Sequence, residues 1–372
     1  MAKYRQCTRC LMDTSDTKIV FNDAGHCNHC IKTINGLKNN KLGRREWFHN
    51  NRYLGPYLEQ IKTSGSEYDA ILGISGGVDS CYAAKICASA GLKILAIHVD
   101  AGWNSESAIK NIENTISYCG FDLITYIVEW DEIRTLQREI IKSGTSNLDV
   151  VQDHVFFAVL FYLARKHKIK KFISGGNFAT ESIMPVSWHE GNALDSRFLK
   201  YFAKKSGLKY KSFKFINFFE HYLFNPYFRK IKTYRPLNYL KYNRDSAIKE
   251  MDIAFGWSDY GGKHCESIFT KVFQYDFLRR RYGFDKRIPH YSSIICSGGI
   301  TRSDAILELE KNVYSTCELN NDLRFFCEKL QLDRAQYEEF LLARKASYFD
   351  YPNWSKLEQG CIKLQKLFKR LV

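Results

Sequence analysis

From about residue 68 onward, short apolar runs alternate with segments long enough to form helices. Four of the apolar runs predict strands, at residues 69–74, 93–99, 123–128 and 171–174. The segments between and after them predict helices, at about residues 79–90, 105–118 and 149–166. Strands that alternate with helices at this spacing form a parallel sheet with helices on both faces. The pattern therefore predicts an α/β fold.

The patterning changes on either side of this region, and we divide the chain into four parts. Residues 1–50 carry two cysteine pairs, end in a polar, basic stretch around 39–45, and are interpreted as a zinc-binding knuckle module. Residues 51–195 are expected to form the sheet domain. Residues 196–250 are interpreted as a basic, aromatic-rich insertion, and residues 251–372 as a mainly helical region that contacts substrate or partners.

Composition and charge narrow the class of protein. The chain has 372 residues, of which 45% are hydrophobic and 26% charged, as in a soluble globular protein. Its formal net charge of +15 suggests an acidic partner such as a nucleotide. Thirteen Lys or Arg residues but a single acid, Glu220, lie between Arg197 and Arg244. We expect this stretch to dock a partner or cover substrate, and nucleic acid, anionic lipid or a merely solvated basic face are the alternatives.

The compartment is inferred from the cysteines and from the apolar runs. The first five residues, Met1 to Arg5, lack the apolar run of a signal peptide. The longest apolar stretch, residues 155–164, is about half of the ~20 residues needed to span a bilayer. Twelve cysteines without a secretion signal are best interpreted as reduced thiols and metal ligands. We therefore expect a cytoplasmic protein with no transmembrane segment.

A Gly-rich turn between the first strand and the first helix predicts a phosphate site. Its six residues are Ser75, Gly76, Gly77, Val78, Asp79 and Ser80. Paired glycines let the backbone approach an anion, and the following helix points free N–H groups and its positive dipole end at the anion. The serines can add hydroxyl donors, and Asp79 can cap the helix or hold Mg²⁺. The Lys of an ordinary P-loop is absent, and the alternative is a plain strand-to-helix turn.

Other strand ends are expected to meet at this turn. Ligands of open parallel sheets bind beyond the carboxyl ends of the strands. His98 and Asp100 end the second strand, and Gly175 and Asn177 follow the fourth. We expect them to contact the adenine, the ribose or the closing edge of the nucleotide site, although a histidine that ends a strand is more often structural.

The four N-terminal cysteines predict a metal site. They form two C-x-x-C knuckles, Cys7 with Cys10 and Cys27 with Cys30. Two such knuckles complete the tetrahedral shell of a structural Zn²⁺. The possible substitute ligands are His26 and His29, and the alternative is four unligated thiols or a redox pair.

A second set of polar candidates follows residue 256. The run from Gly256 to Ser267 is dense in polar residues beside glycines, and further basic residues follow it. Lys and Arg side chains here can neutralise a leaving pyrophosphate, and Glu266 can contact sugar hydroxyls or orient ammonia as a base. Each can equally be a surface ion pair or a helix cap. The candidates for catalysis are Lys263, Glu266 and Arg302, together with Asp79, and those for substrate binding are Tyr260, His264, Arg287 and His290.

These motifs carry two resemblances, one to a superfamily of proteins and one to a narrower family. Residues 68–185, with the turn at 75–80, resemble the ATP pyrophosphatase superfamily, which transfers AMP from ATP to a substrate oxygen. With the cysteine knuckles and the run at 260–267, nearly the whole chain resembles the N-acetyl-sugar amidotransferases of the WbpG and PseA type from bacterial surface-polysaccharide pathways. The resemblance implies a fold of the adenine-nucleotide α-hydrolase type, with an N-terminal zinc ribbon and a helical C-terminal part.

The resemblance also implies a reaction and its cofactors. With ATP and Mg²⁺, an acetamido group of a sugar or nucleotide sugar becomes an acetamidino group through an adenylated imidate that ammonia attacks. Such enzymes usually receive ammonia from a glutaminase and a cyclase-like subunit, both resembling histidine-biosynthesis proteins. The sequence agrees with that dependence, because position 2 is Ala and no cysteine has the setting of a glutaminase nucleophile.

Two rival interpretations stay open. A tRNA-modifying enzyme of the two-finger thiolase type also combines a cysteine module with an adenylating loop, and a net charge of +15 suits RNA. That type needs a second C-x-x-C finger, and none follows Cys30, so sulfur transfer is not expected. Non-thiolating tRNA chemistry stays open, although nucleic acid is not the expected partner. The other rival is a non-catalytic zinc-bearing adapter that keeps a nucleotide-binding fold.

Overall fold

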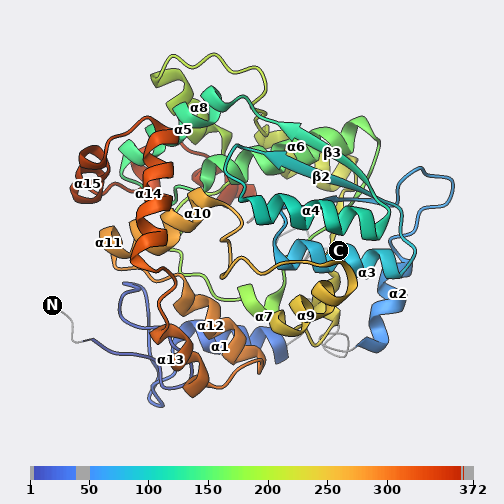
Figure 1. Cartoon of the computed structure of the whole chain (residues 1–372), viewed down its shortest axis with the longest axis horizontal. Helices are drawn as coiled ribbons and strands as arrows, with labels where there is room; N and C mark the ends of the chain where they lie inside the picture. The colour runs from blue at the N-terminus through green and yellow to red at the C-terminus, as the bar shows by residue number, and fades with distance from the viewer. Residues whose placement is uncertain (1–3, 39–50, 362, 364–372) are drawn as a thin grey trace.

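The computed structural model describes residues 4–38, 51–361 and 363, and contains a five-stranded parallel sheet (Figure 1). The basic stretch predicted at residues 39–45 and the predicted boundary at residue 50 lie outside the described residues. The order of the strands is β3-β2-β1-β4-β5, with every neighbouring pair parallel. Their bounds are Ala70–Gly73 (β1), Ile94–Asp100 (β2), Asp122–Ile127 (β3), Lys171–Ile173 (β4) and Lys232–Tyr234 (β5).

The register of β1 explains why it is the centre of the sheet. Ala70 pairs with Ile94 of β2, and Ile71 pairs with Phe172 of β4. Successive side chains of a strand point to opposite faces, and both faces of β1 are buried, as its unbroken apolar sequence requires. The strand order turns back at β1, so the crevice beyond the ends of β1 and β4 is the topological switch point where such sheets bind ligands.

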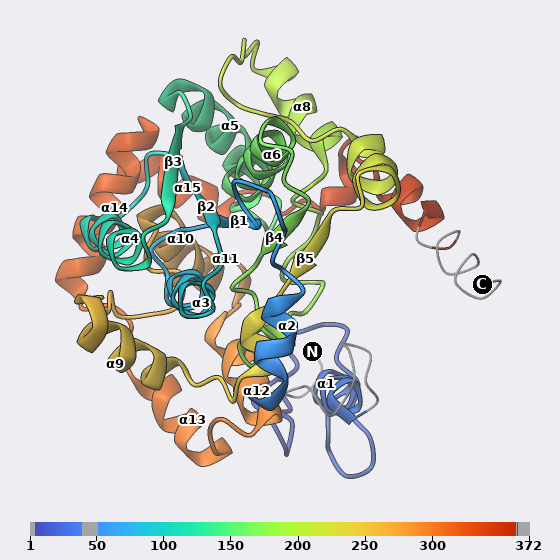
Figure 2. The same ribbon diagram turned by 90° about the vertical axis from the view of Figure 1, so that its right-hand side faces the viewer.

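Helices cover both faces of the sheet, as Figure 2 shows. One core contains Ala70 and Leu72 of β1 and is covered by α3 (Val78–Ser89), α4 (Glu106–Cys119) and α9 (Arg244–Phe255). The other core contains Ile71 and is covered by α5 (Trp130–Ser143), α6 (Val150–Lys166) and α8 (Ser196–Lys205). The predicted α/β fold with a parallel sheet is confirmed.

The C-terminal part is helical, as predicted, but it shares the core of the sheet. Phe269 of α10 (Ile268–Val272) and Phe326 of α14 (Thr316–Leu330) stack with ring centroids 5.3 Å apart inside the core that contains Ile71. The remaining elements of this part are η5 (Phe273–Phe277), α11 (Leu278–Tyr282), α12 (Arg287–Ser297), α13 (Arg302–Glu310), α15 (Arg334–Leu342) and η6 (Tyr348–Asp350).

The N-terminal cysteine module packs against α12. Its single helix, α1 (Asn28–Lys38), lies beside α12, and Ile183 of the segment after α7 (Phe178–Glu181) joins the small core around the four cysteines. The module is therefore joined to the C-terminal helices rather than to the sheet. The short elements η2 (Asn51–Tyr53) and α2 (Leu54–Glu59) begin the next described segment.

The structure differs from the sequence analysis in the region interpreted as a basic insertion. This region supplies β5, which pairs with β4 through Phe172 opposite Thr233, and also η3 (Glu220–Phe228) and η4 (Pro236–Tyr239). Strand β5 was missed because it has only three residues and lies at the edge of the sheet, where little apolar patterning is required. The division of the chain into four parts remains a prediction. Among the described helices, none is long and apolar enough to cross a bilayer.

Candidate active site

The Gly-rich turn connects β1 to α3, and its hydroxyl groups surround the start of the helix. Gly77 is the N-cap of α3, and its backbone N–H donates to Ser75 Oγ at 3.3 Å. The N–H of Val78 donates to the hydroxyl of Tyr260 at 3.2 Å. Ser80 Oγ donates to the carbonyl of Gly77 at 3.0 Å. Hydroxyl oxygens thus occupy the acceptor positions that an anion takes at a helix N-terminus.

Two glycines are required by the packing around this turn. Gly76 has a φ of 79°, and a Cβ atom there would lie 2.3 Å from the carbonyl oxygen of Ala108 in α4. A Cβ atom on Gly175 would lie 2.6 Å from the carbonyl oxygen of Asp79 and 2.8 Å from the nitrogen of Ser80. The end of β4 is therefore in direct contact with the first turn of α3.

Replacing Gly76 with Ala is expected to destabilise the protein by about 2–4 kcal/mol, because left-handed strain and a backbone clash add together. Gly91 is the matched control, since its φ is 67° but nothing lies within 4 Å of the added Cβ atom. Gly91→Ala should cost only about 1 kcal/mol. Urea unfolding measures both. Equal losses of stability in the two variants would show that the contact with Ala108 imposes no constraint.

An ion cluster lies beside the turn and is centred on Lys263. Its ammonium nitrogen lies 2.7 Å from Glu181 Oε1, 3.2 Å from Thr180 Oγ1 and 3.6 Å from Asp79 Oδ2. Burial lowers the pKa of Lys263, but Glu181 and Asp79 outweigh it, and the net pKa is raised. Lys263 therefore stays cationic next to the helix start.

The two carboxylates of this cluster differ in their environment. Burial raises the pKa of Asp79 more than Lys263 lowers it. Burial also acts on Glu181, but there Lys263 prevails and the net pKa is lowered. Asp79 does not cap α3, which was one of its expected roles, because Gly77 is the N-cap and the Asp79 carboxylate accepts a hydrogen bond from the hydroxyl of Tyr242.

The segment that carries Glu266 pairs with residues 103–105, which follow β2. The N–H of Ser105 donates to the carbonyl of Glu266 at 2.9 Å, and the N–H of Ile268 donates to the carbonyl of Trp103 at 3.0 Å. This pairing directs the Glu266 carboxylate at the turn, where its Oε1 would lie 3.0 Å from a Cβ atom on Gly77. Its Oε2 is buried without a hydrogen-bond partner among the described residues.

His264 faces this carboxylate from a strained position. Its φ is 64°, in the left-handed region, and its Nδ1 lies 3.9 Å from Glu266 Oε1. Burial lowers the pKa of His264, but Glu266 outweighs it and the net pKa is raised. Burial raises the pKa of Glu266, but His264 and Tyr260 outweigh it and the net pKa is lowered. The pair is thus a carboxylate beside an imidazole with increased affinity for protons.

The residues at the strand ends that were expected to contact the nucleotide form hydrogen bonds mainly with other protein groups in this structure. His98 lies with its Nδ1 3.1 Å from the carbonyl of Ile74, and its Nε2 3.1 Å from Asn104 Nδ2. Asp100 Oδ1 accepts from the N–H of Gly102 at 2.8 Å. Asn177 caps α7 by accepting from the N–H of Thr180 at 3.0 Å. Their roles toward a nucleotide remain predictions.

The candidates on the C-terminal helices separate into two groups. His290 donates from Nδ1 to the carbonyl of Thr180 at 3.1 Å, and burial followed by the charge of Lys263 lowers its pKa to about 3. It is therefore a neutral neighbour of the ion cluster. The guanidinium of Arg287 is held by Asp285 and by the carbonyl of Lys311 at 2.8 Å.

Arg302 lies at the cysteine module instead of at the cluster. Its guanidinium donates to Gln6 Oε1 at 2.8 Å, to the carbonyl of Cys10 at 3.2 Å and to that of Cys7 at 3.3 Å. The structure thus brings together Asp79, Tyr260, Lys263, His264, Glu266 and His290 around the turn, with Gly175 and Asn177, but it does not add Arg287 or Arg302. The reason is that both guanidinium groups are occupied by partners of their own.

A polar group at the start of α6 was missed by the sequence analysis. Asp149 accepts from Thr270 Oγ1 at 2.8 Å and from Gln274 Nε2 at 3.2 Å. Burial, followed by the charge of Asp149, raises the pKa of the half-buried Asp153 to about 7. Burial lowers the pKa of Lys286, which attracts both carboxylates. Two acids spaced i, i+4 at the start of an otherwise apolar helix were the available signal.

Replacing Asp153 with Asn is expected to increase the free energy of unfolding at high pH. An unfolded Asp titrates near ~3.9, so between that pH and about 7 the folded protein binds more protons than the unfolded chain and loses stability as the pH rises. Asn removes this penalty, which we expect to be about 1–2 kcal/mol at pH ~8.5 and small at pH ~4. Denaturant unfolding across this range measures the difference. The control is Asp245→Asn, because the side chain of Asp245 is 81% exposed. If the difference in the free energy of unfolding between Asp153→Asn and the unmodified protein does not change with pH, the expectation is contradicted.

The four N-terminal cysteines form a compact sulfur cluster. All four Sγ atoms lie within 4.8 Å of one another, with Cys7 and Cys30 3.8 Å apart and Cys10 and Cys27 3.5 Å apart. The edge of a tetrahedral Zn–S₄ site is about 3.8 Å for Zn–S bonds of ~2.3 Å. Backbone N–H groups also donate to the sulfurs, including that of Cys27 to Cys7 Sγ at 3.2 Å. The donor set therefore fits a structural zinc ion.

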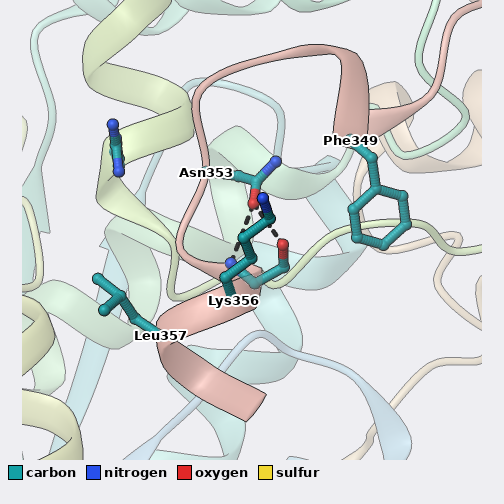
Figure 3. Close-up of a pocket in the computed structure, with 6 residues that line it drawn as sticks. Phe349, Asn353, Lys356 and Leu357 are labelled. Carbon is teal, nitrogen blue, oxygen red and sulfur yellow. Dashed lines mark hydrogen bonds between the residues drawn. The ribbon is translucent and has the colours of Figure 1, made fainter. Parts of the chain in front are cut away.

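Figure 3 shows a pocket of about 290 Å³ in a different part of the chain. None of its lining residues belongs to the ion cluster. They are Arg197, Phe349, Asn353, Ser355, Lys356 and Leu357.

Comparisons with known proteins add the following. No curated protein matches the chain. Among solved structures, an NH3-dependent NAD synthetase from Campylobacter jejuni is 18% identical, with a TM-score of 0.30, over 43% of this chain and 77% of that chain. An NMN synthetase from Francisella tularensis is 14% identical, with a TM-score of 0.25, over 66% and 90%. A 4-thiouridine synthetase–RNA complex with bound ATP is 15% identical, with a TM-score of 0.34, over 74% and 54%.

The family comparison concerns the C-terminal part. Residues 266–367, which begin at Glu266 of the candidate site, match the family described as LPS biosynthesis protein WbpG-like, C-terminal domain. This match confirms the resemblance to WbpG-type proteins for the C-terminal part of the chain.

Proposed function

We propose that the protein is an ATP-dependent, AMP-forming amidotransferase that converts an acetamido group of a sugar or nucleotide sugar into an acetamidino group. The observation that carries this proposal is the ion cluster beside the turn at 75–80. A half-buried cation, Lys263, lies at the N-terminus of α3 and is held there by Glu181 and Asp79. A helix start with an adjacent fixed cation suits a phosphate chain that departs with negative charge.

In this proposal the turn binds the β- and γ-phosphates of ATP. The N–H groups of Gly77 and Val78, now bonded to hydroxyl oxygens, would donate to phosphate oxygens, and Lys263 would neutralise the leaving pyrophosphate. Asp79 and Glu181 offer the carboxylate oxygens that Mg²⁺ prefers, and bound Mg²⁺ would supply further charge neutralisation.

The chemistry consists of two displacements. The amide oxygen of the acetamido group attacks the α-phosphorus, the bond to the bridging oxygen breaks, and pyrophosphate leaves. Ammonia then attacks the imidate carbon, and AMP leaves with the former amide oxygen. We assign Glu266 to the second step, because its ionised carboxylate has an oxygen without a partner among the described residues and can accept a hydrogen bond from ammonia.

The acceptor would lie between the turn and the polar group of Asp149, Asp153 and Lys286. His264 lies 3.9 Å from Glu266, and its charge also acts to lower the pKa values of both aspartates. We further propose that the reaction takes place in the cytoplasm and that a glutaminase and a cyclase-like subunit supply the ammonia.

The test incubates the purified protein with ATP, Mg²⁺, ammonium chloride and nucleotide sugars whose acetamido oxygen is oxygen-18. We expect AMP and pyrophosphate in equal amounts, with the label in the AMP phosphate. Parallel reactions contain unlabelled tRNA in place of the sugar, or no acceptor. ADP as the nucleotide product, or AMP formed with tRNA alone, would contradict the proposal.

A further inference from the structure

The π-helix η3 presents an unusual number of apolar side chains to solvent. It stands at the edge of the molecule beyond α6, as the yellow-green helix in Figure 2. Large exposed apolar patches on a protein surface mark interaction sites. Within ten residues, five large side chains are 43–70% exposed: Phe219, Leu223, Phe224, Tyr227 and Phe228.

A set of lysines lies beside these side chains, at the amino ends of β4 and β5. Residues 165–171 and 219–232 together contain eight Lys or Arg residues and one acid, Glu220. That acid is neutralised, because Glu220 Oε1 lies 2.5 Å from Arg165 and 2.7 Å from Arg229. The exposed lysines among them are Lys166, Lys168, Lys170, Lys230 and Lys232.

Backbone and side-chain contacts hold the two segments together. The N–H of Lys232 donates to the carbonyl of Lys170 at 2.9 Å, and the N–H of Ile231 donates to that of Asn225 in η3 at 2.9 Å. The ion pair of Arg165 with Glu220 ties η3 to α6. Aromatic side chains and lysines therefore share one surface, which we name the η3 surface.

We propose that the η3 surface docks the protein on an anionic lipid bilayer. A helix that exposes Phe, Leu and Tyr beside lysines has the composition of an interfacial anchor, whose rings enter the headgroup region while the cations contact acidic lipids. Protein–protein interfaces are depleted in lysine, and single-stranded nucleic acid prefers grooves lined by stacking rings to a convex helix.

The position of the η3 surface suits such docking. The lysines lie at the amino ends of β4 and β5, whereas the turn at 75–80 follows the carboxyl end of β1 in the same parallel sheet. A bilayer on the η3 surface would thus leave the candidate active site facing away from the lipid. This inference does not depend on the proposed reaction.

The test is flotation of the full chain with vesicles of pure phosphatidylcholine and with vesicles rich in phosphatidylglycerol. We expect binding to the anionic vesicles, weakened by salt. Lys230→Gln with Lys232→Gln should reduce the partition coefficient by about tenfold or more. Phe224→Ser with Phe228→Ser should reduce it at least as much. The matched control is Phe349→Ser with Lys249→Gln, two exposed residues outside the η3 surface, which should bind like the unmodified chain.

Three results would overturn the proposal. The first is no binding to anionic vesicles at low salt. The second is equal binding by the control and the η3 variants. The third is that the unmodified chain binds single-stranded RNA but not the vesicles, and that both η3 variants lose RNA binding equally. The η3 surface would then be a nucleic-acid site. Circular dichroism of each variant separates lost binding from lost folding.

Discussion

Replacing Lys263 with Met is expected to reduce the rate of AMP formation by about 10³-fold or more, the effect of removing a preorganised charge from a departing anion. The proposed role gives the physical reason. Pyrophosphate gains negative charge as it leaves, and Lys263 is a cation already fixed by Glu181 and Asp79 at 2.7 and 3.6 Å. A fixed cation needs no rearrangement when the charge develops.

Loss of folding must be separated from loss of chemistry in this variant. Met leaves Glu181 and Asp79 without their cation, so the pKa of Glu181 is expected to rise and the protein to lose some stability at neutral pH. The matched control is Lys249→Met, an exposed lysine of α9, for which no change is expected. Single-turnover AMP formation and thermal melting are measured together. A rate of AMP formation within tenfold of that of the unmodified protein would contradict the assignment of Lys263 to the leaving group.

The sequence predicted the sheet well because parallel strands leave a strong pattern. Strands buried on both faces are unbroken apolar runs, and β1, β2 and β4 were each found within about two residues of their observed bounds. The turn at 75–80 was found for a related reason, since Gly76 must take a positive φ and approach Ala108 closely. In these places the residues of one short segment were sufficient to predict its structure.

The candidate site was harder to predict because its members come from distant segments. Lys263 and Glu181 are 82 residues apart, and Tyr242 and Asp79 are 163 apart. Nothing in a local pattern indicates which acid will face which base. Arg302 illustrates the same problem, because a basic residue beside glycines was expected to bind phosphate but instead binds backbone carbonyls of the cysteine module.

Replacing Cys27 with Ser is expected to abolish zinc binding and to lower stability by about 2–5 kcal/mol, since structural zinc contributes its binding energy to folding. The four sulfurs are completely buried, so a serine hydroxyl there would face thiols without metal. Cys317→Ser is the matched control, because Cys317 is an exposed cysteine of α14. Metal analysis and thermal melting of the two variants give the comparison.

The same change should also reduce AMP formation in the protein that remains folded. The N–H of Leu11 in the module donates to Ser292 Oγ of α12 at 3.1 Å. His290 of α12 donates to the carbonyl of Thr180, whose hydroxyl contacts Lys263 at 3.2 Å. Losing the zinc loosens the first of these contacts, so Lys263 should be less well positioned. In a second experiment, zinc is removed from the unmodified protein and then restored, and the rate of AMP formation should recover. Unchanged zinc content and melting temperature in Cys27→Ser would refute the metal site, whereas lost zinc with full activity would refute only its connection to Lys263.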